Sequence, residues 1–129
     1  MKILLQQLWL WVALGAAGGG LGRYGFGLLV GKGAWFQWPT LVVNVLGGFV
    51  IGAVAFVLLQ KPEASPVWRV LLITGFCGGF TTFSSFSLEM LGLLQAQRYA
   101  GAISLALAHV LLSVAATALA WWLLQKWWA

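Results

Sequence analysis

The residues best suited to chemistry lie together at residues 75–87, which read Gly-Phe-Cys-Gly-Gly-Phe-Thr-Thr-Phe-Ser-Ser-Phe-Ser inside a long apolar segment. Each glycine is about 1 kcal/mol less favourable than alanine inside a helix, and Thr and Ser side chains compete for backbone hydrogen bonds. We therefore predict that a helix is broken between Gly78 and Thr81. At membrane depth such a break must be buried in protein or line a water-filled cavity. The freed carbonyls should then face an ion, water or a partner chain.

Phe83 and Phe86 follow the predicted break and lie three residues apart, which places them on one face of a helix. The edge of a phenyl ring is electropositive, so ring edges beside the hydroxyls of the same stretch suit a small anion. The alternative is that both rings only pack against lipid and neighbouring helices, the usual role of large apolar side chains. The spacing alone allows either interpretation.

Three polar side chains elsewhere in the apolar segments are also candidates. Arg23 is an ionisable group within a span, which marks a functional residue unless its guanidinium snorkels to the lipid headgroups. Asn44 must find hydrogen-bond partners, either in a pathway or as a bond between helices. Glu89 lies eight residues past Thr81, about 12 Å along a helix, which would bring it near one membrane face, in a water-filled vestibule.

His109, Ser113 and Thr117 recur every four residues, so they form a polar stripe on one face of a helix. Such a stripe is typical of a pore wall or of a seam between packed helices. A lone histidine in a bundle is more often a satisfied packing residue than a ligand, although His109 could also lie at a pore mouth.

The elements that must position these residues follow from the composition, since 62% of the 129 residues are hydrophobic and 7% are charged. Soluble domains carry about a quarter charged residues, so we predict a single all-α membrane domain over residues 1–129. Four apolar segments, at residues 4–30, 40–59, 67–94 and 102–124, predict four transmembrane helices joined by short turns. The third is longer than the roughly 30 Å hydrocarbon core requires, which again favours a helix broken at its centre.

Pairs of glycines four residues apart predict close contacts between helices, at Gly18 and Gly22, at Gly27 and Gly31, and at Gly48 and Gly52. Four helices of this size are too few to enclose a pathway, so we expect an oligomer. The single cysteine, Cys77, is predicted to be a small buried residue rather than a reactive thiol.

The net charge of +5 arises from seven basic residues that are scattered along the chain. Nucleic-acid binding needs a basic cluster, so no nucleic-acid partner is expected. Side chains with metal-ligand spacing and nucleophile–base pairs are not visible, so an enzyme is not expected either. With the N-terminus inside, the cytoplasmic ends would carry Lys2, Lys61, Arg69 and Lys126, against Lys32 and Arg98, with or without Arg23, on the other side. So weak a bias predicts insertion in both orientations and antiparallel pairing of two copies.

At this point the sequence resembles the CrcB/Fluc family of fluoride channels. Three motifs carry the resemblance: Gly75-Phe-Cys-Gly-Gly-Phe-Thr-Thr-Phe-Ser-Ser-Phe-Ser87 with Glu89 following, Thr40-Leu-Val-Val-Asn-Val-Leu-Gly-Gly-Phe49, and the less specific Gly19-Gly-Leu-Gly-Arg-Tyr24. Departures are small: Ser85 stands where Thr is common, Gly48 where Ser is common, and Gly20 where Ala is usual.

The resemblance implies an antiparallel, dual-topology homodimer that passively exports fluoride through two pores. It would be a multi-pass protein of a bacterial inner membrane, in contact with lipid. The fluoride pathway would be formed by Asn44, Phe83, Ser84, Phe86, His109, Ser113 and Thr117. Arg23 and Glu89 would lie near the vestibules. Carbonyls of Gly78 and Thr81 from both subunits would hold a structural, central sodium ion.

Two other functions compete with this expectation. A small multidrug transporter also has four spans, but it needs a membrane-embedded carboxylate, typically in the first span, and the first segment here has none. A structural or assembly subunit of a larger membrane complex would use the polar stripe of His109, Ser113 and Thr117 as a seam between helices. Fluoride efflux, drug–proton exchange or no transport from liposomes would distinguish the three.

Overall fold

The computed structural model describes residues 2, 6–31 and 38–129, without the side chain of Trp38, and the regular elements among them are all helical. In chain order they are α2 (Leu8–Val30), α3 (Trp38–Gln60), α4 (Pro66–Arg69), the π-helix η1 (Val70–Cys77), α5 (Gly78–Phe80), α6 (Phe83–Gln95) and α7 (Tyr99–Trp128). The predicted start of the first segment at Leu4 and most of the turn at residues 31–38, with Lys32, lie outside the described residues.

Among the described residues, three helical stretches are long and apolar enough to cross a membrane: Pro39–Gln60, Pro66–Gln95 and Tyr99–Trp128. They match the second, third and fourth predicted segments, and the chain is a multi-pass membrane protein. Helix α2 has 23 residues but is not among the three, because its seven glycines and Arg23 lower its hydropathy. A fourth span at α2 therefore stays a prediction.

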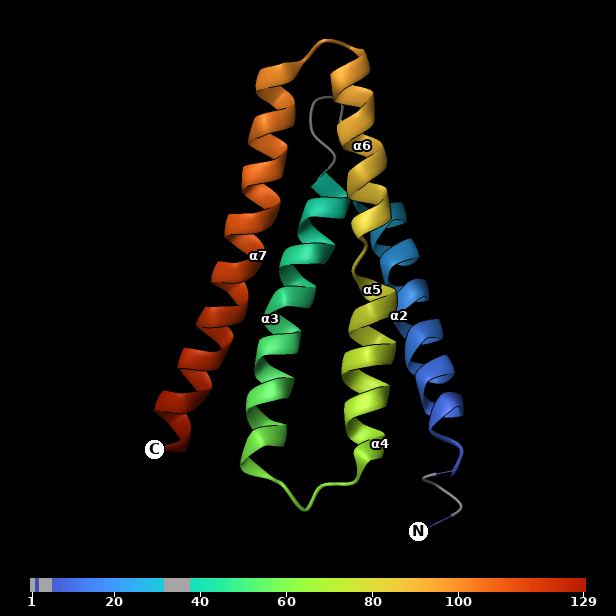
Figure 1. Ribbon diagram of the computed structural model, residues 1–129, viewed down its shortest axis with the longest axis vertical. Helices are drawn as coiled ribbons and strands as arrows, with labels where there is room; N and C mark the ends of the chain where they lie inside the picture. The colour runs from blue at the N-terminus through green and yellow to red at the C-terminus, as the bar shows by residue number, and fades with distance from the viewer. Residues whose placement is uncertain (1, 3–5, 32–37) are drawn as a thin grey trace.

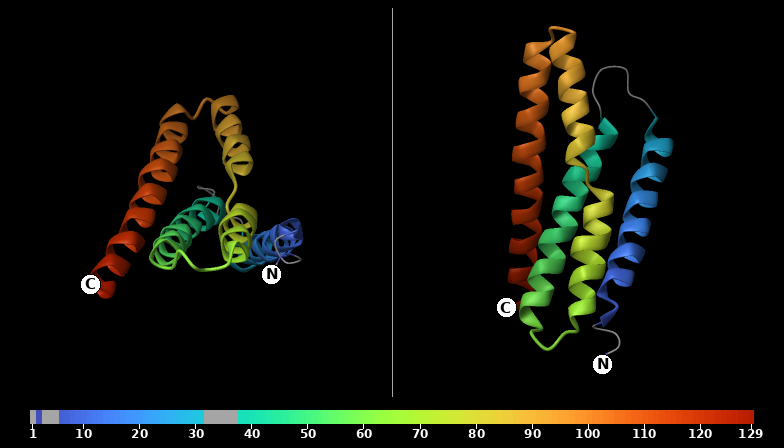
Figure 2. Two further views of the ribbon diagram at one scale, coloured as in Figure 1. Left: turned by 60° about the horizontal axis from the view of Figure 1, so that its bottom comes forward. Right: turned by 45° about the vertical axis from the view of Figure 1, so that its right-hand side comes forward.

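The long helices alternate in direction, and α3 lies between α7 and the α4–η1–α5 stretch (Figure 1). Helix α3 packs mainly on α7, whereas α2 packs on η1 and α5. After α5 the chain steps sideways, so that α6 continues on a displaced axis and approaches α7 (Figure 2). The start of α2 and the end of α7 lie at the same end of the molecule (Figure 1).

Four glycines bring α2 against η1 and α5. Gly15 and Gly19 are buried, and a Cβ atom built on Gly75 would lie 2.8 Å from the Cα of Gly15. A Cβ atom on Gly79 would lie 3.0 Å from the Cα of Ala16. These distances leave no room for a side chain, so the two backbones touch directly.

The two predicted glycine pairs on α2 make no backbone contact with a helix of the described chain. Gly18 and Gly22 face the rings of Phe76 and Phe80 instead, and nothing lies within 4 Å of a Cβ atom built on Gly27 or Gly31. The physical reason is helix rotation: the face of α2 that meets η1 is one position away from the predicted one.

The third pair is confirmed, because Gly48 and Gly52 bring α3 against α7. A Cβ atom on Gly48 would lie 2.8 Å from the carbonyl oxygen of Ser113, and one on Gly52 would lie 3.1 Å from the Cα of Thr117. The polar stripe on α7 therefore borders this helix–helix seam. Cys77 is buried as predicted, with 3% of its surface exposed.

Candidate functional site

The third segment is broken, as predicted, but at Thr81 and Thr82. Both residues are extended, with φ and ψ of −87° and 159° at Thr81 and −153° and 117° at Thr82. Gly78, at −62° and −37°, is still helical, so placing the start of the break there was wrong. The absence of a side chain at Gly79 allows it to pack on α2 and does not break the helix. The break follows from the capping of α6. Thr82 is its N-cap, and its Oγ1 accepts a hydrogen bond of 3.1 Å from the Ser85 N–H.

Asn44 on α3 holds the extended residues in place. Its Oδ1 accepts a hydrogen bond of 2.8 Å from the Thr82 N–H, and its Nδ2 donates one of 3.1 Å to the Thr82 carbonyl. In a continuous helix the Thr82 N–H would bond to the carbonyl of Gly78. The contact therefore bridges two helices through the backbone, and one N–H of the Asn44 amide is left for another acceptor.

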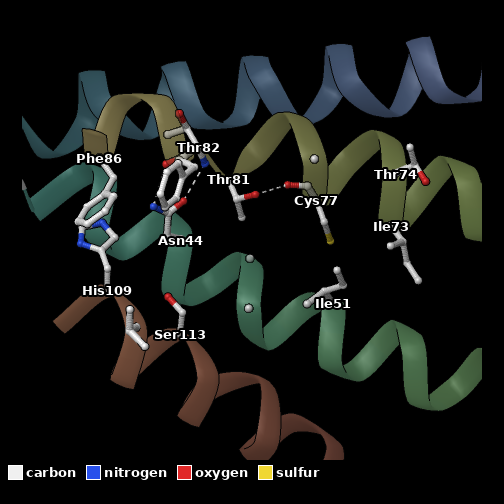
Figure 3. A pocket seen from close by; sticks show the side chains of 15 residues that line it. Asn44, Ile51, Ile73, Thr74, Cys77, Thr81, Thr82, Phe86, His109 and Ser113 are labelled. Atoms are coloured by element: carbon white, nitrogen blue, oxygen red, sulfur yellow. Dashed lines mark hydrogen bonds between the residues drawn. The ribbon is translucent and has the colours of Figure 1, made fainter. Parts of the chain in front are cut away.

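Two of the carbonyls that lose their helical donors at the break belong to residues that line one groove. The first is that of Gly78, whose helical donor bonds to Asn44. The second is that of Thr81, because the Ser85 N–H that would reach it in a helix bonds to Thr82 Oγ1. Both residues line the same groove beside α3 (Figure 3). Oxygen atoms released in this way are available to water or a cation.

Two other nearby carbonyls are occupied. That of Cys77 accepts from the Thr81 N–H at 2.9 Å and from Thr81 Oγ1 at 2.8 Å. That of Gly79 accepts from Nε of Arg23 at 3.2 Å. Arg23 is half-buried and reaches across to the broken helix, which argues against the snorkelling alternative.

The two phenylalanines differ in their surroundings. Phe83 is 79% exposed, whereas Phe86 is half-buried, and their ring centroids lie 5.4 Å apart. The ring of Phe86 also meets that of His109 on α7, with centroids 4.4 Å apart (Figure 3). This contact cannot be predicted from residue spacing, because the two rings belong to different helices, α6 and α7.

His109 is the polar residue that is most buried among those described, with 7% of its surface exposed. Its Nδ1 lies 3.1 Å from the carbonyl oxygen of Leu105, which can only accept, so Nδ1 carries a proton. Its Nε2 is buried without a partner in the described part of the chain. His109 thus belongs to the groove wall as well as to the packing of α6 on α7.

A groove of about 470 Å³ runs between α3, the broken third segment and α7. It brings together seven of the predicted site residues: Asn44, Gly78, Thr81, Phe83, Phe86, His109 and Ser113. Figure 3 shows Asn44 on α3 beside Thr82, Ser113 on α7, and the Phe86 and His109 rings at one end. Rings, an amide, a hydroxyl and free carbonyls therefore face one space.

Four predicted residues lie outside this groove. Thr117 shares its hydroxyl between the carbonyls of Gly48, at 2.8 Å, and Ser113, at 3.0 Å, and borders a second groove with Ser113. Ser84 is exposed, with its Oγ 3.2 Å from that of Thr82. Arg23 is engaged with Gly79, as described above.

Glu89 lines a separate cavity of about 470 Å³ between α3 and α6. Its Oε1 accepts a short hydrogen bond from the hydroxyl of Thr40, and its Oε2 is buried without a partner among the described residues. Thr40 was missed as a site residue, although its hydroxyl at the start of an apolar segment is a signal of the same kind as Asn44.

Comparison with known proteins places these features in a family. Residues 10–121 match the family described as CrcB-like protein, Camphor Resistance (CrcB). The "Fluoride-specific ion channel FluC" of Saccharophagus degradans is 44% identical over 125 residues, which cover 92% of this chain and 90% of that protein. The proteins of the same name from Bordetella petrii and Paracidovorax citrulli are 46% and 41% identical, and the matches cover 92% and 87% of this chain and 91% and 93% of theirs.

The matched residues include the break in the third segment, Asn44, and the residues of α7 that line the groove. Identity above 40% over about nine-tenths of both chains leaves no doubt about common descent. The chain belongs to the CrcB family.

Proposed function

We propose that this protein is a fluoride channel that lets fluoride leave the cell passively. The observation that carries the proposal is the groove at the broken helix, in a chain whose relatives are named fluoride-specific ion channels. The proposal includes the inner membrane of a bacterium as its location. It does not include enzymatic chemistry.

The groove offers groups that suit fluoride. Fluoride is small and strongly hydrated, so a pathway must replace its water with donors that bind it weakly enough for release. The second N–H of Asn44, the hydroxyl of Ser113 and the electropositive ring edges of Phe83 and Phe86 are such donors. The nearest described guanidinium, that of Arg23, is bonded to a carbonyl. A cationic side chain that would trap the anion is therefore not part of the proposed pathway.

The functional unit is proposed to be an antiparallel, dual-topology homodimer, in which each copy crosses the membrane four times and α2 forms the first span. Phe83, which the pathway needs, is 79% exposed in one copy, so a single copy does not enclose the groove. A second copy would cover it, and two related grooves would make two pathways. Ser84 and Thr117 would extend each pathway, and Arg23 and Glu89 would lie near its ends.

The freed carbonyls of Gly78 and Thr81 support a structural sodium ion at the centre of the dimer. Each copy supplies two oxygens that have lost their helical donors, and two copies would supply four. Rings of backbone carbonyls are known cation ligands in channels. The described residues contain no cluster of His, Cys, Asp and Glu that could hold a metal, so backbone oxygen is the fitting donor set. Bound sodium would hold the two breaks together.

Fluoride efflux from liposomes tests this function. The purified chain is reconstituted in vesicles loaded with potassium fluoride or potassium chloride, and an ion-selective electrode follows release after valinomycin is added. We expect rapid release of fluoride and little release of chloride. Release no faster than from protein-free vesicles, or equal release of both ions, would refute the proposal.

A further inference from the structure

We propose that Arg23 is a positioning residue for the cation site: it ties the carbonyl of Gly79 to α2 and so holds the last helical turn where Gly78 and Thr81 line the groove. The inference rests on the proposed function and adds a role for a residue that stands outside the groove. It starts from the hydrogen bond of 3.2 Å between Nε of Arg23 and the Gly79 carbonyl.

The carbonyls around the break divide into two groups. That of Cys77 is held from within by Thr81, and that of Gly79 is held from outside by Arg23. Gly78 and Thr81 line the groove, whereas Gly79 does not line it and packs on Ala16 and Gly20 of α2. Arg23 on α2 and Asn44 on α3 thus bind the backbone on either side of Thr81, at Gly79 and at Thr82.

The charge of Arg23 suits this position. A cation is favoured at the C-terminal end of a helix, where the backbone dipole is negative, and α5 ends at Phe80. The guanidinium is half-buried, so its hydrogen bond to a carbonyl is stronger than one exposed to water. Without it, the Gly79 carbonyl would lose the hydrogen bond from α2 that the described residues provide, and the last turn before the break could reorient.

Two other roles for Arg23 predict different behaviour. If its positive charge merely stood near the sodium site, removing it would relieve repulsion and strengthen sodium binding. If it drew fluoride toward the pathway, removing it would change the dependence of transport on fluoride and leave the dependence on sodium unchanged. A positioning role predicts weaker sodium binding when the hydrogen bond is lost, whatever the charge.

The test uses three variants of the whole chain. Arg23→Lys keeps the charge and one donor, Arg23→Gln keeps a donor without the charge, and Arg23→Met keeps only the apolar stem. Purified proteins in detergent are heated in increasing NaCl, with N-methyl-D-glucamine chloride holding the ionic strength constant. The midpoint of the sodium-dependent rise in melting temperature is the primary readout. Fluoride efflux at several sodium concentrations is the second.

We expect Arg23→Met to need about tenfold more sodium, which is a loss of about 1.4 kcal/mol in the free energy of sodium binding. Arg23→Lys should stay near the wild type, and Arg23→Gln should lie between them. If Arg23→Met does not fold, the inference requires that Arg23→Gln still needs more sodium than Arg23→Lys. An unchanged or lower sodium requirement in both neutral variants would overturn the inference.

The outcome for the wild type separates this inference from the proposed function. If the wild type responds to sodium but releases no fluoride, the channel proposal fails and the role of Arg23 is still measured by the melting curves. If the wild type releases fluoride but sodium does not stabilise it, the cation site and the role of Arg23 fail together, and the channel proposal stands.

Discussion

Asn44 bonds to the backbone of Thr82 through both ends of its amide, accepting from the N–H at 2.8 Å and donating to the carbonyl at 3.1 Å. The two residues are 38 positions apart in the chain, and the contact joins α3 to the break in the third segment. Asn44 therefore has a structural task in addition to any contact with fluoride. A substitution of Asn44 must therefore be measured for its effect on stability and for its effect on fluoride transport.

The first prediction concerns this contact. Asn44→Asp has nearly the same shape but replaces the donor to the Thr82 carbonyl with an oxygen, so two acceptors would face each other. We expect a loss of about 1–3 kcal/mol in stability together with loss of fluoride transport, which an ionised carboxylate would also repel. Thermal unfolding in detergent and liposome efflux measure the two effects.

Thr82→Ala is the matched control for that prediction. It keeps both backbone groups that Asn44 contacts and removes the N-cap of α6, which costs about 1 kcal/mol, together with the contacts of the same hydroxyl to Ser84 and Ser85. A variant Asn44→Asp that is as stable as the wild type and conducts at the same rate would show that the amide contact has no importance.

The second prediction separates the two rings. Replacing either Phe83 or Phe86 with Ile removes the electropositive ring edge, so fluoride efflux should fall in both variants. Stability should fall more in Phe86→Ile, by about 1 kcal/mol, because Phe86 meets the His109 ring at 4.4 Å as well as the Phe83 ring, whereas Phe83 is 79% exposed in one copy. Efflux and thermal unfolding of the same preparations test this.

Phe49→Ile serves as the control for a ring outside the groove, since Phe49 is 39% exposed and does not line it. Its efflux should equal that of the wild type. If Phe83→Ile and Phe86→Ile also conduct normally, both rings only pack.

The third prediction concerns the backbone contact of α2 with η1. Gly75→Ala would place a Cβ atom 2.8 Å from the Cα of Gly15, and neither backbone can yield easily. We expect a loss of about 1–3 kcal/mol from overpacking. Gly20→Ala is the control, because nothing lies within 4 Å of its added Cβ atom and alanine favours the helix. Equal melting temperatures for the two variants would contradict the packing described here.

The local pattern predicts the break better than it predicts its position. Glycines and hydroxyl residues at residues 75–87 indicate a weakened helix, but Gly78 and Gly79 are helical and the chain opens at Thr81. The reason is that partners from other helices decide which weak point opens. Asn44 accepts a hydrogen bond from the Thr82 N–H, and no local rule identifies an acceptor from a different segment.

Helix faces show the same limit. Glycines of α2 at positions 15, 18, 19 and 22 offer two overlapping pairs with the spacing of four, and spacing alone cannot say which pair meets a neighbour. Contact with η1 selects Gly15 and Gly19. The polar side chains of Asn44, Ser113 and His109 did identify residues that line the groove. A polar side chain in an apolar helix must face something polar.

The last prediction concerns orientation in the membrane, on which the proposed antiparallel dimer depends. The basic residues at opposite ends of the spans differ in number by only one or two, so both orientations should occur in one membrane. Two or three lysines inserted between Lys32 and Gln37 should force one orientation, and the same insertion between Lys61 and Ser65 should force the other. Each variant alone should fail to protect fluoride-sensitive cells, and co-expression should restore protection.

The orientation of each variant is verified by the accessibility of a cysteine introduced into either loop, in a Cys77→Ala background. Immunoblots verify equal expression. Cys77→Ala without the insertions is the control and should protect cells as the wild type does. The antiparallel pairing predicts rescue because only opposite copies can cover each other's groove, where Phe83 is 79% exposed in one copy. Protection by either fixed-orientation variant alone would instead require a parallel assembly or a functional single copy.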